Sequence, residues 1–205
     1  LMTEAIGAAS MMEIPTVYIN VMRAGPSTGV PTKTEQGDLW QALGASQGDF
    51  QRFVVAPLTA LDAFDTMPEL FNLTDRYQCP GIVLSDLLLS EGRYSVDPDS
   101  IDLHPAIDRG ELITEAGENG TDYKRYVVTE SGVSPRAIPG TPGHVHVVAT
   151  DEHDEDSTLV SDEFTNPHVR RRMVEKRAKK LIGVEEQIAP PELLGAADAE
   201  VTLVG

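Results

Sequence analysis

The stretch between residues 23 and 33 contains the residue types best suited to binding an anion. It has two glycines, two prolines, three hydroxyl residues and two fixed positive charges. An apolar, β-branched run at 15–21 comes directly before it and is typical of a buried parallel strand. Because ligands of open α/β sheets bind beyond the carboxyl ends of the strands, we expect this loop to face a ligand crevice.

Arg23 is the residue that we expect to hold the anion. It is the second residue after the predicted strand, and its guanidinium can bind a carboxylate or a phosphate through two parallel hydrogen bonds. Gly25 and Gly29 would let the backbone approach a ligand closely, and Pro26 and Pro31 would stiffen that approach. The alternative interpretation is a rigid surface turn in which Arg23 forms an ordinary salt bridge.

The composition restricts the kinds of partner. A chain of 205 residues is long enough for one domain, or one and a part. Its net charge of −17 argues against nucleic acid and anionic membranes as partners. The excess of acidic residues over lysine and arginine is typical of high-salt adaptation, with an ordinary acidic cytoplasmic protein as the alternative. Cys79 is the single cysteine, so this chain forms no internal disulfide and supplies no Cys-ligated zinc or iron–sulfur site.

The ends of the chain suggest a piece of a longer polypeptide. Leu1 already lies inside a helical pattern, and 201–205 resembles a first strand cut before its loop. The sequence shows no signal peptide and no apolar run of about 20 residues. We therefore expect a soluble, cytoplasmic protein without membrane contact.

Predicted strands and helices alternate over the first 90 residues, which indicates an α/β fold with a parallel sheet. Thr59 is a good N-cap for the third helix, and Pro68 marks a kink or a break within it. The predicted order is helix 1–13, strand 16–21, helix 35–45, strand 52–56, helix 59–78 and strand 80–85.

Beyond residue 91 the pattern predicts an irregular connector with short strands and one long helix. Strands are expected at 122–129 and 144–149, with a loop at 134–143 between them. A helix is expected over 166–186, with Asn166 as its cap and Pro167 in the first turn. A linker at 189–199 leads to the terminal strand.

Two charged groups outside the anion loop have competing interpretations. His144, His146 and His153 lie beside acidic residues and could bind a divalent metal, but they form no closed ligand set of known spacing. We favour a loop of solvated carboxylates and predict no metal site. The run 168–180 has four Arg and three Lys. Since the chain is strongly negative, a salt-bridged helix or a subunit contact is favoured over an RNA site.

Known catalytic motifs do not explain the anion loop. Ser27 lacks the spacing of a hydrolase nucleophile, and the stretch 25–33 lacks the Gly-Lys-Ser/Thr end of a phosphate-binding P-loop. Reasoning from residue types alone therefore ends at an α/β anion-binding module of unknown chemistry.

The segment from Arg23 to Leu39 resembles the corresponding loop of the alpha subunit of 2-oxoacid:ferredoxin oxidoreductases. That family usually has Gln-Arg-x-Gly-Pro-Ser-Thr-Gly-x-Pro-Thr, followed by Gln-x-Asp-Leu, at this place. Segment 122–155 is most similar to the 2-oxoglutarate type, in which the alpha subunit carries a fused gamma domain; a pyruvate type is the alternative. Further segments fall in the family's order: 4–7, 48–50, 56–57, 83–86, 134–137, 139–140 and 151–155.

The resemblance implies an incomplete thiamine-diphosphate-binding fold of the pyrimidine-domain type. Residues 1–92 would form the C-terminal part of that domain, 93–199 a connector, and 200–205 the first strand of a transketolase C-terminal-like domain. The implied reaction is CoA-dependent oxidative decarboxylation of a 2-oxoacid, 2-oxoglutarate first, to an acyl-CoA with reduction of ferredoxin. Thiamine diphosphate with Mg²⁺ and a four-iron four-sulfur cluster would be held mostly by the beta subunit and by parts of alpha outside this chain.

The resemblance also gives roles to residues of the loop. Arg23 would hold the substrate carboxylate, and Gly25, Pro26, Ser27 and Thr28 would shape the pocket beside it. It assigns no catalytic and no cofactor-binding residue to this chain.

This chain departs from the family at several places. Met22 replaces the usual Gln, and Gln47 stands where many relatives have His. The family's Tyr-Pro-Ile-Thr-Pro motif and its activating Glu are not in this chain, so we expect no activity from it alone. A noncatalytic anion-binding or scaffold module on the same fold is the competing hypothesis.

Overall fold

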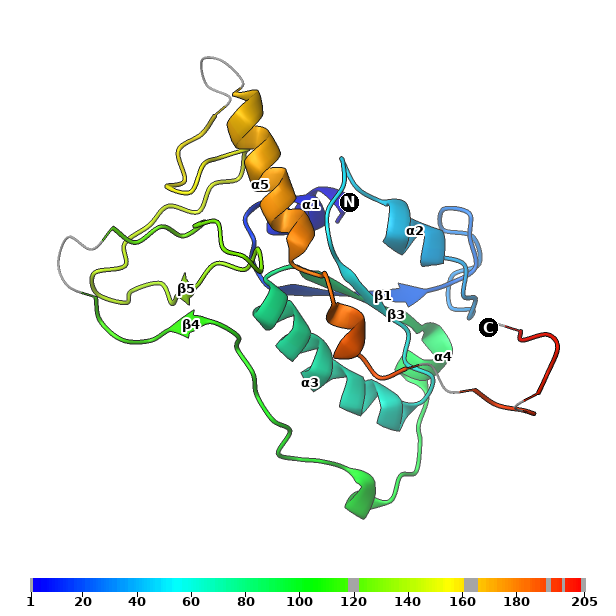
Figure 1. Cartoon of the computed structure of the whole chain (residues 1–205). Coiled ribbons are helices and arrows are strands. Elements are labelled where there is room, and N and C mark those ends of the chain that lie inside the picture. Colours follow the sequence, from blue (N-terminus) through cyan, green and yellow to red (C-terminus); the bar gives the residue numbers. More distant parts are fainter. Residues whose placement is uncertain (1, 118–121, 161–165, 191–192, 197, 204–205) are drawn as a thin grey trace.

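A three-stranded parallel sheet forms the centre of the molecule. The computed structural model describes residues 2–117, 122–160, 166–190, 193–196 and 198–203 (Figure 1). The strands β1 (Thr16–Met22), β2 (Phe53–Val55) and β3 (Pro80–Asp86) lie in the order β1-β3-β2. Thr16 pairs with Pro80 and Met22 with Asp86, so β1 and β3 end at the same edge. The predicted parallel α/β fold is confirmed.

Helices cover both faces of this sheet. The helices α1 (Thr3–Met11) and α2 (Leu39–Gly44) lie on one side, α3 (Ala60–Tyr77) lies on the other, and the short α4 (Leu87–Glu91) follows β3 (Figure 1). Thr59 caps α3 as predicted, because its Oγ1 accepts a hydrogen bond from the Asp62 amide at 3.1 Å. The helix continues through Pro68, so no break occurs there. The second helix begins at Leu39 instead of 35, because 34–38 form no regular secondary structure.

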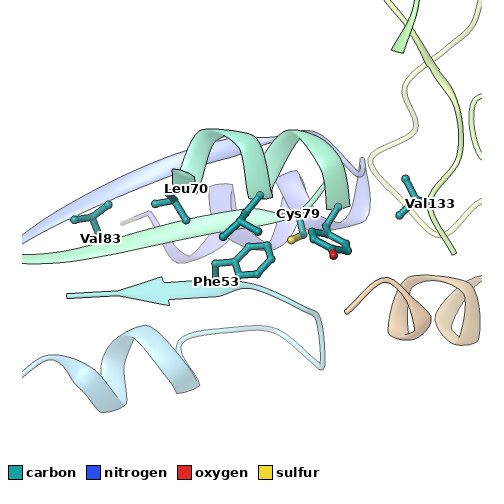
Figure 2. Packing of buried hydrophobic residues seen from close by; sticks show 7 residues of the cluster. Phe53, Leu70, Cys79, Val83 and Val133 are labelled. Atoms are coloured by element: carbon teal, nitrogen blue, oxygen red, sulfur yellow. The ribbon is translucent and has the colours of Figure 1, made fainter. Parts of the chain in front are cut away.

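The main hydrophobic cluster lies between α3 and the sheet. Figure 2 shows its side chains, with Val133 reaching it from the connector. Gly81 allows the close packing, because a Cβ there would lie 2.8 Å from Leu70 Cδ1. A second cluster fills the opposite face of the sheet. The main cluster comprises Phe53, Leu70, Leu73, Tyr77, Cys79, Val83 and Val133, and the second Ile6, Met22, Ala42, Ile82 and Leu84.

The connector is irregular, as predicted, although two of its expected strands do not form. It contains a 3₁₀ turn η1 (Pro98–Ser100) and a short parallel pair, β4 (Leu112–Ile113) with β5 (Arg136–Ala137). The prediction of a strand at 122–129 was wrong, because this segment pairs with no other strand in the described chain. The side chains of Arg125 and Tyr126 are buried. They bond to backbone carbonyls at the end of α1 instead of pairing with a strand.

The prediction of a strand at 144–149 was also wrong. His144 and His146 pack against the ring of Tyr123, with ring centroids 5.0 and 5.4 Å apart. The valines between and after them point outward and are exposed. The alternation that suggested a strand therefore reflects packing on one tyrosine, and no neighbouring strand pairs with this segment among the described residues. β5 lies inside the predicted loop 134–143.

The helix α5 (Pro167–Lys179) ends earlier than predicted. Asn166 caps it as expected, since its Oδ1 accepts hydrogen bonds from the amides of His168 and Val169. A turn at Gly183, with φ of 78°, precedes the 3₁₀ turn η2 (Val184–Glu186), so the helix does not reach 186. The described part of the predicted terminal strand, 201–203, forms no strand, and 204–205 lie outside the described residues. Within the described residues, every helix is too short or too polar to span a bilayer.

A buried group of charges joins α1, the connector and α5. We call it the Glu13 cluster: Glu13, Arg125, Lys176 and Lys180. The Glu13 carboxylate accepts from Lys176 Nζ at 2.7 Å and pairs with Lys180 Nζ at 2.6 Å, and all three side chains are buried. Burial opposes ionisation of Glu13, but the two ammonium groups outweigh it and lower its pKa to about 2. The cluster therefore fixes α5 against the sheet domain.

The arginines of α5 form the predicted ion pairs. Arg170 and Arg177 bind Glu152, and Arg172 pairs with Glu155. The interpretation of 168–180 as a salt-bridged helix is confirmed.

Candidate functional site

The anion loop begins where the central strands end. Met22 is the last residue of β1 and lies opposite Asp86, the last residue of β3. Because the strands are parallel, Arg23 and the start of α4 lie at the same edge of the sheet, where open α/β sheets place their ligands.

Residues 24–30 close into a small hairpin. The Val30 amide donates to the Ala24 carbonyl at 3.0 Å, and the two residues form an isolated antiparallel bridge. Gly29 has φ of 53°, and a Cβ there would lie 1.8 Å from the Ala24 oxygen. Only glycine fits this position, so the residue type is set by the closure of the hairpin. The Gly25–Pro26 peptide bond is cis, and the hairpin tip is exposed.

The chain returns to the sheet along residues 34–38, which we call the return limb. Thr34 Oγ1 accepts from the Leu88 amide at 2.9 Å, at the start of α4. Gln36 Nε2 donates to Asp86 Oδ2 at 2.9 Å. Asp38 Oδ2 accepts from Asn20 Nδ2 of β1, also at 2.9 Å. The return limb is thus attached to the ends of both β1 and β3.

The Arg23 side chain is exposed and unpaired within the described part of the chain. The interpretation of Arg23 as one half of an ordinary salt bridge is therefore not supported by any contact there. The structure places all five predicted site residues in one exposed loop, and the side chains of Ser27 and Thr28 likewise bond to none of the described residues. The loop offers a fixed charge and two hydroxyls to a ligand.

The three histidines have structural contacts. His153 is buried, its Nδ1 lies 2.7 Å from the Asp151 carbonyl, and its ring centroid lies 4.0 Å from that of Tyr126. Burial lowers the pKa of His153 below its ordinary range. The neighbouring Glu152 and Glu155 belong to the ion pairs of α5. Within the parts of the chain that the structure describes, no three His, Cys, Asp or Glu residues form a group that could hold a metal ion.

A separate cavity of about 300 Å³ lies between α1, β1 and α2. Its walls are mostly apolar, with Ile6, Tyr18 and Ile82 among them, and Asn20 and Asp38 supply polar atoms. Arg23 is not part of its lining. The cavity touches the end of the return limb but contains none of the predicted site residues.

Sequence reasoning missed the residues that hold the loop. Thr34, Gln36 and Asp86 were given no part in holding the loop, although all three lie in segments on which the resemblance rests. The Glu13 cluster was also missed. The one local signal for it was the spacing of Lys176 and Lys180, which places both on one face of a helix.

The fold and the loop together define the class of protein: a parallel α/β unit that presents, beyond the carboxyl edge of its sheet, an arginine with no partner among the described residues. The family described as "Pyruvate flavodoxin/ferredoxin oxidoreductase, thiamine diP-bdg" matches residues 1–175. The chain belongs to this thiamine-diphosphate-binding family.

Individual relatives agree with this assignment. The chain is 36% identical, over its whole length, to a 2-oxoacid:ferredoxin oxidoreductase subunit alpha of Saccharolobus solfataricus, of which it covers 32%. It is 35% identical to 2-oxoglutarate oxidoreductase subunit KorA of Mycobacterium tuberculosis, again over its whole length and 30% of the relative. The chain thus spans about a third of the length of these curated relatives.

A solved structure supports the fold. A 2-oxoglutarate:ferredoxin oxidoreductase from Magnetococcus marinus, with 2-oxoglutarate, coenzyme A and succinyl-CoA bound, superposes with a TM-score of 0.76 at 32% identity. The match covers 96% of this chain and 33% of the other. The parallel-sheet fold and the predicted family are both confirmed.

Proposed function

We propose that this chain is part of the alpha subunit of a 2-oxoacid:ferredoxin oxidoreductase. The enzyme would catalyse CoA-dependent oxidative decarboxylation of a 2-oxoacid to an acyl-CoA and pass the electrons to ferredoxin. The observation that carries the proposal is Arg23, exposed and without a partner in the described chain, on a closed loop at the ligand edge of a thiamine-diphosphate-family fold. Residues 1–92 would contribute to the pyrimidine-binding domain, and 93–199 would form its connector.

Arg23 would bind the carboxylate of the 2-oxoacid. A planar guanidinium can grip both carboxylate oxygens and so orient the adjacent keto carbon toward the reacting group. Gly25, Pro26, Ser27 and Thr28 would form the wall beside the substrate, with the two hydroxyls available as donors. This geometry supports a binding role for the loop, while the proton-transfer groups lie on other parts of the enzyme.

The residues of this chain are better suited to binding the substrate than to binding the metal ion and diphosphate of the cofactor. When bound, thiamine diphosphate supplies the electron sink for decarboxylation. Mg²⁺ requires a set of oxygen ligands, and no three His, Cys, Asp or Glu residues of the described chain are grouped so that they could hold a metal ion. A four-iron four-sulfur cluster requires four thiolates, whereas this chain has one cysteine, Cys79, which is buried. Both groups would therefore be held mainly by a beta subunit.

The substrate that we favour is 2-oxoglutarate. Both the Mycobacterium tuberculosis relative and the Magnetococcus marinus structure carry 2-oxoglutarate in their names, and the latter was solved with that compound bound. Pyruvate remains the alternative, because the family description names pyruvate. Both compounds have the 2-oxoacid carboxylate that Arg23 would bind.

The decisive experiment is an assay of the full-length parent protein together with its co-purifying partner. We expect a partner that contains thiamine diphosphate and iron, and reduction of a viologen dye that requires both CoA and a 2-oxoacid. Comparing 2-oxoglutarate with pyruvate at equal concentrations would identify the substrate. A parent protein without such a partner and without dye reduction would contradict the proposal and favour a noncatalytic anion-binding module.

A further inference from the structure

We infer that Gln36 and Asp86 are positioning residues that hold the anion loop so that Arg23 meets the substrate carboxylate. This inference rests on the proposed function, because it gives Arg23 the carboxylate as its ligand. Neither residue touches the substrate in this arrangement. They act through the return limb, which is attached to the end of β3 and the start of α4.

Asp86 connects three parts of the structure with one carboxylate. Its Oδ2 accepts from Gln36 Nε2 at 2.9 Å, and its Oδ1 accepts from the Leu89 amide at 2.8 Å, which caps α4. As the last residue of β3, it is fixed by pairing with Met22 on β1. Met22, which precedes Arg23 in the chain, and Asp86, which holds the return limb, are therefore neighbours in one sheet.

Hydrogen bonds carry most of the attachment of the loop, because apolar burial contributes little. Residues 25–37 are all exposed, so their side chains gain little from the hydrophobic effect. Within the described residues, the return limb has two side-chain bonds to the β3–α4 junction: Gln36 to Asp86, and Thr34 to the Leu88 amide. Loss of either should let the loop sample other positions and reduce the time that Arg23 spends in the binding position.

The charge state of Asp86 suits this role. The hydrogen bond from the Leu89 amide and that from Gln36 both lower the pKa of the Asp86 carboxyl. The carboxylate is thus ionised at neutral pH and accepts both bonds, which makes each stronger than a bond between neutral groups.

The test uses the assembled enzyme with four substitutions: Gln36→Ala, Thr34→Val, Asp86→Asn and, as a matched control, Gln47→Ala. Gln47 is also an exposed glutamine bonded to a carboxylate, since its Nε2 donates to Glu4 at 3.0 Å, but it lies outside the loop. Asp86→Asn is the conservative variant: it can keep both bonds if the Gln36 amide turns over, because asparagine offers one acceptor and one donor.

Two measurements separate positioning from general instability. The first is the rate of trypsin cleavage after Arg23 and Lys33. This rate reports how mobile the loop is and does not require an active enzyme. The second is the division of the kinetic effect between KM for the 2-oxoacid and kcat, with KM for CoA as an internal reference.

We expect Gln36→Ala and Thr34→Val to be cut faster and to raise KM for the 2-oxoacid about tenfold, the effect of losing one hydrogen bond to a charged or backbone group. Both should leave KM for CoA and kcat within about twofold, and Arg23→Ala should remove the effect of Gln36→Ala on KM. Gln47→Ala should match the parent in both measurements, and Asp86→Asn should lie closer to the parent than Gln36→Ala does.

Three results would overturn the inference. Unchanged cleavage and unchanged KM in Gln36→Ala would show that the bond does not hold the loop. A second such result would be faster cleavage of Gln36→Ala with an unchanged KM for the 2-oxoacid, while Arg23→Ala still raises that KM. The Gln36–Asp86 bond would then hold the loop, but substrate binding by Arg23 would not depend on the bond. The inference would fail and the proposed function would stand. If Arg23→Ala also left KM unchanged, the carboxylate role of Arg23 itself would fail, and the inference with it.

Discussion

Two charged regions of this molecule have opposite arrangements. In the Glu13 cluster the charges are buried: Lys176 and Glu13 have no exposed side-chain surface and lie 2.7 Å apart. In the anion loop the Arg23 guanidinium is exposed and has no partner among the described residues. Both regions lie in a chain with a net charge of −17, in which carboxylates are plentiful.

The difference indicates what each charge does. Buried charges remain ionised only when partners replace the water that they lose, so the Glu13 cluster must keep its contacts for the fold to persist. An arginine left unpaired in so acidic a chain retains its full capacity for a ligand. We therefore expect changes in the cluster to affect folding, and changes in the loop to affect binding.

The largest effect is expected for Glu13→Ala. Removing the carboxylate leaves Arg125, Lys176 and Lys180 buried together without a counter-charge, which should lower the free energy of unfolding by about 3 to 5 kcal/mol. Urea denaturation of variant and parent would measure the loss. A change below about 1 kcal/mol would mean that water or structural relaxation compensates the lysines.

The pH dependence of stability provides a second test of the cluster. The pKa of Glu13 falls from 4.5 to about 2 in the folded state, so the unfolded chain binds more protons between these values. The stabilisation is complete above pH 4.5 and is lost as the pH falls toward 2, amounting to about 3 kcal/mol. Other carboxylates also titrate here, so the relevant quantity is the difference between the parent and Glu13→Gln. If the free energy of unfolding fell equally steeply with decreasing pH in the parent and in Glu13→Gln, the prediction would be contradicted.

Arg23→Ala should affect substrate binding and leave the stability of the fold nearly unchanged, the reverse of Glu13→Ala. We expect kcat/KM for the 2-oxoacid to fall about 100-fold, because a charge-assisted pair of hydrogen bonds is lost, chiefly through a higher KM. The free energy of unfolding should change by less than about 0.5 kcal/mol, since the side chain is exposed and unpaired in the described chain. Arg23→Lys should recover part of the affinity. Unchanged kcat/KM would exclude Arg23 from the substrate site.

The smallest effect is expected on the outer face of α5. Arg171 and Glu175 form an ion pair at 2.9 Å with both side chains mostly exposed. Arg171→Ala should cost only about 0.3 to 0.5 kcal/mol, because solvent and salt screen such a pair. This variant, on the same helix as Lys176, would show that burial rather than charge pairing alone distinguishes the Glu13 cluster. A loss comparable to that of Glu13→Ala would remove that distinction.

Local features of the structure could be predicted from the sequence. Thr59 and Asn166 cap their helices as expected, because a cap requires only a side-chain oxygen within a few residues of free amides. The strands at 16–22 and 80–86 were found from short apolar runs. The anion loop was recognised from its glycines, prolines and positive charges directly after a strand, whereas the hairpin closure that requires Gly29 was seen only in the structure.

Features that depend on distant contacts were not predictable. The segment 144–149 alternates like a strand, but its histidines pack on Tyr123 and no strand pairs with it in the described chain. The segment 122–129 is fixed by bonds from Arg125 and Tyr126 to the carbonyls directly after α1, more than 100 residues earlier. Periodicity reports which side of a segment is buried but not which partner buries it.

The sequence by itself determined the parallel α/β fold, the family and the position of Arg23 in its loop. These are encoded in contiguous residues whose backbone preferences act locally. Only the tertiary structure decided which charges are paired and which are free. Glu13 meets Lys176 across 163 positions and Gln36 meets Asp86 across 50. Such pairings arise when the sheet brings separate strand ends and helices together, and for that reason Arg23 remains available while Glu13 does not.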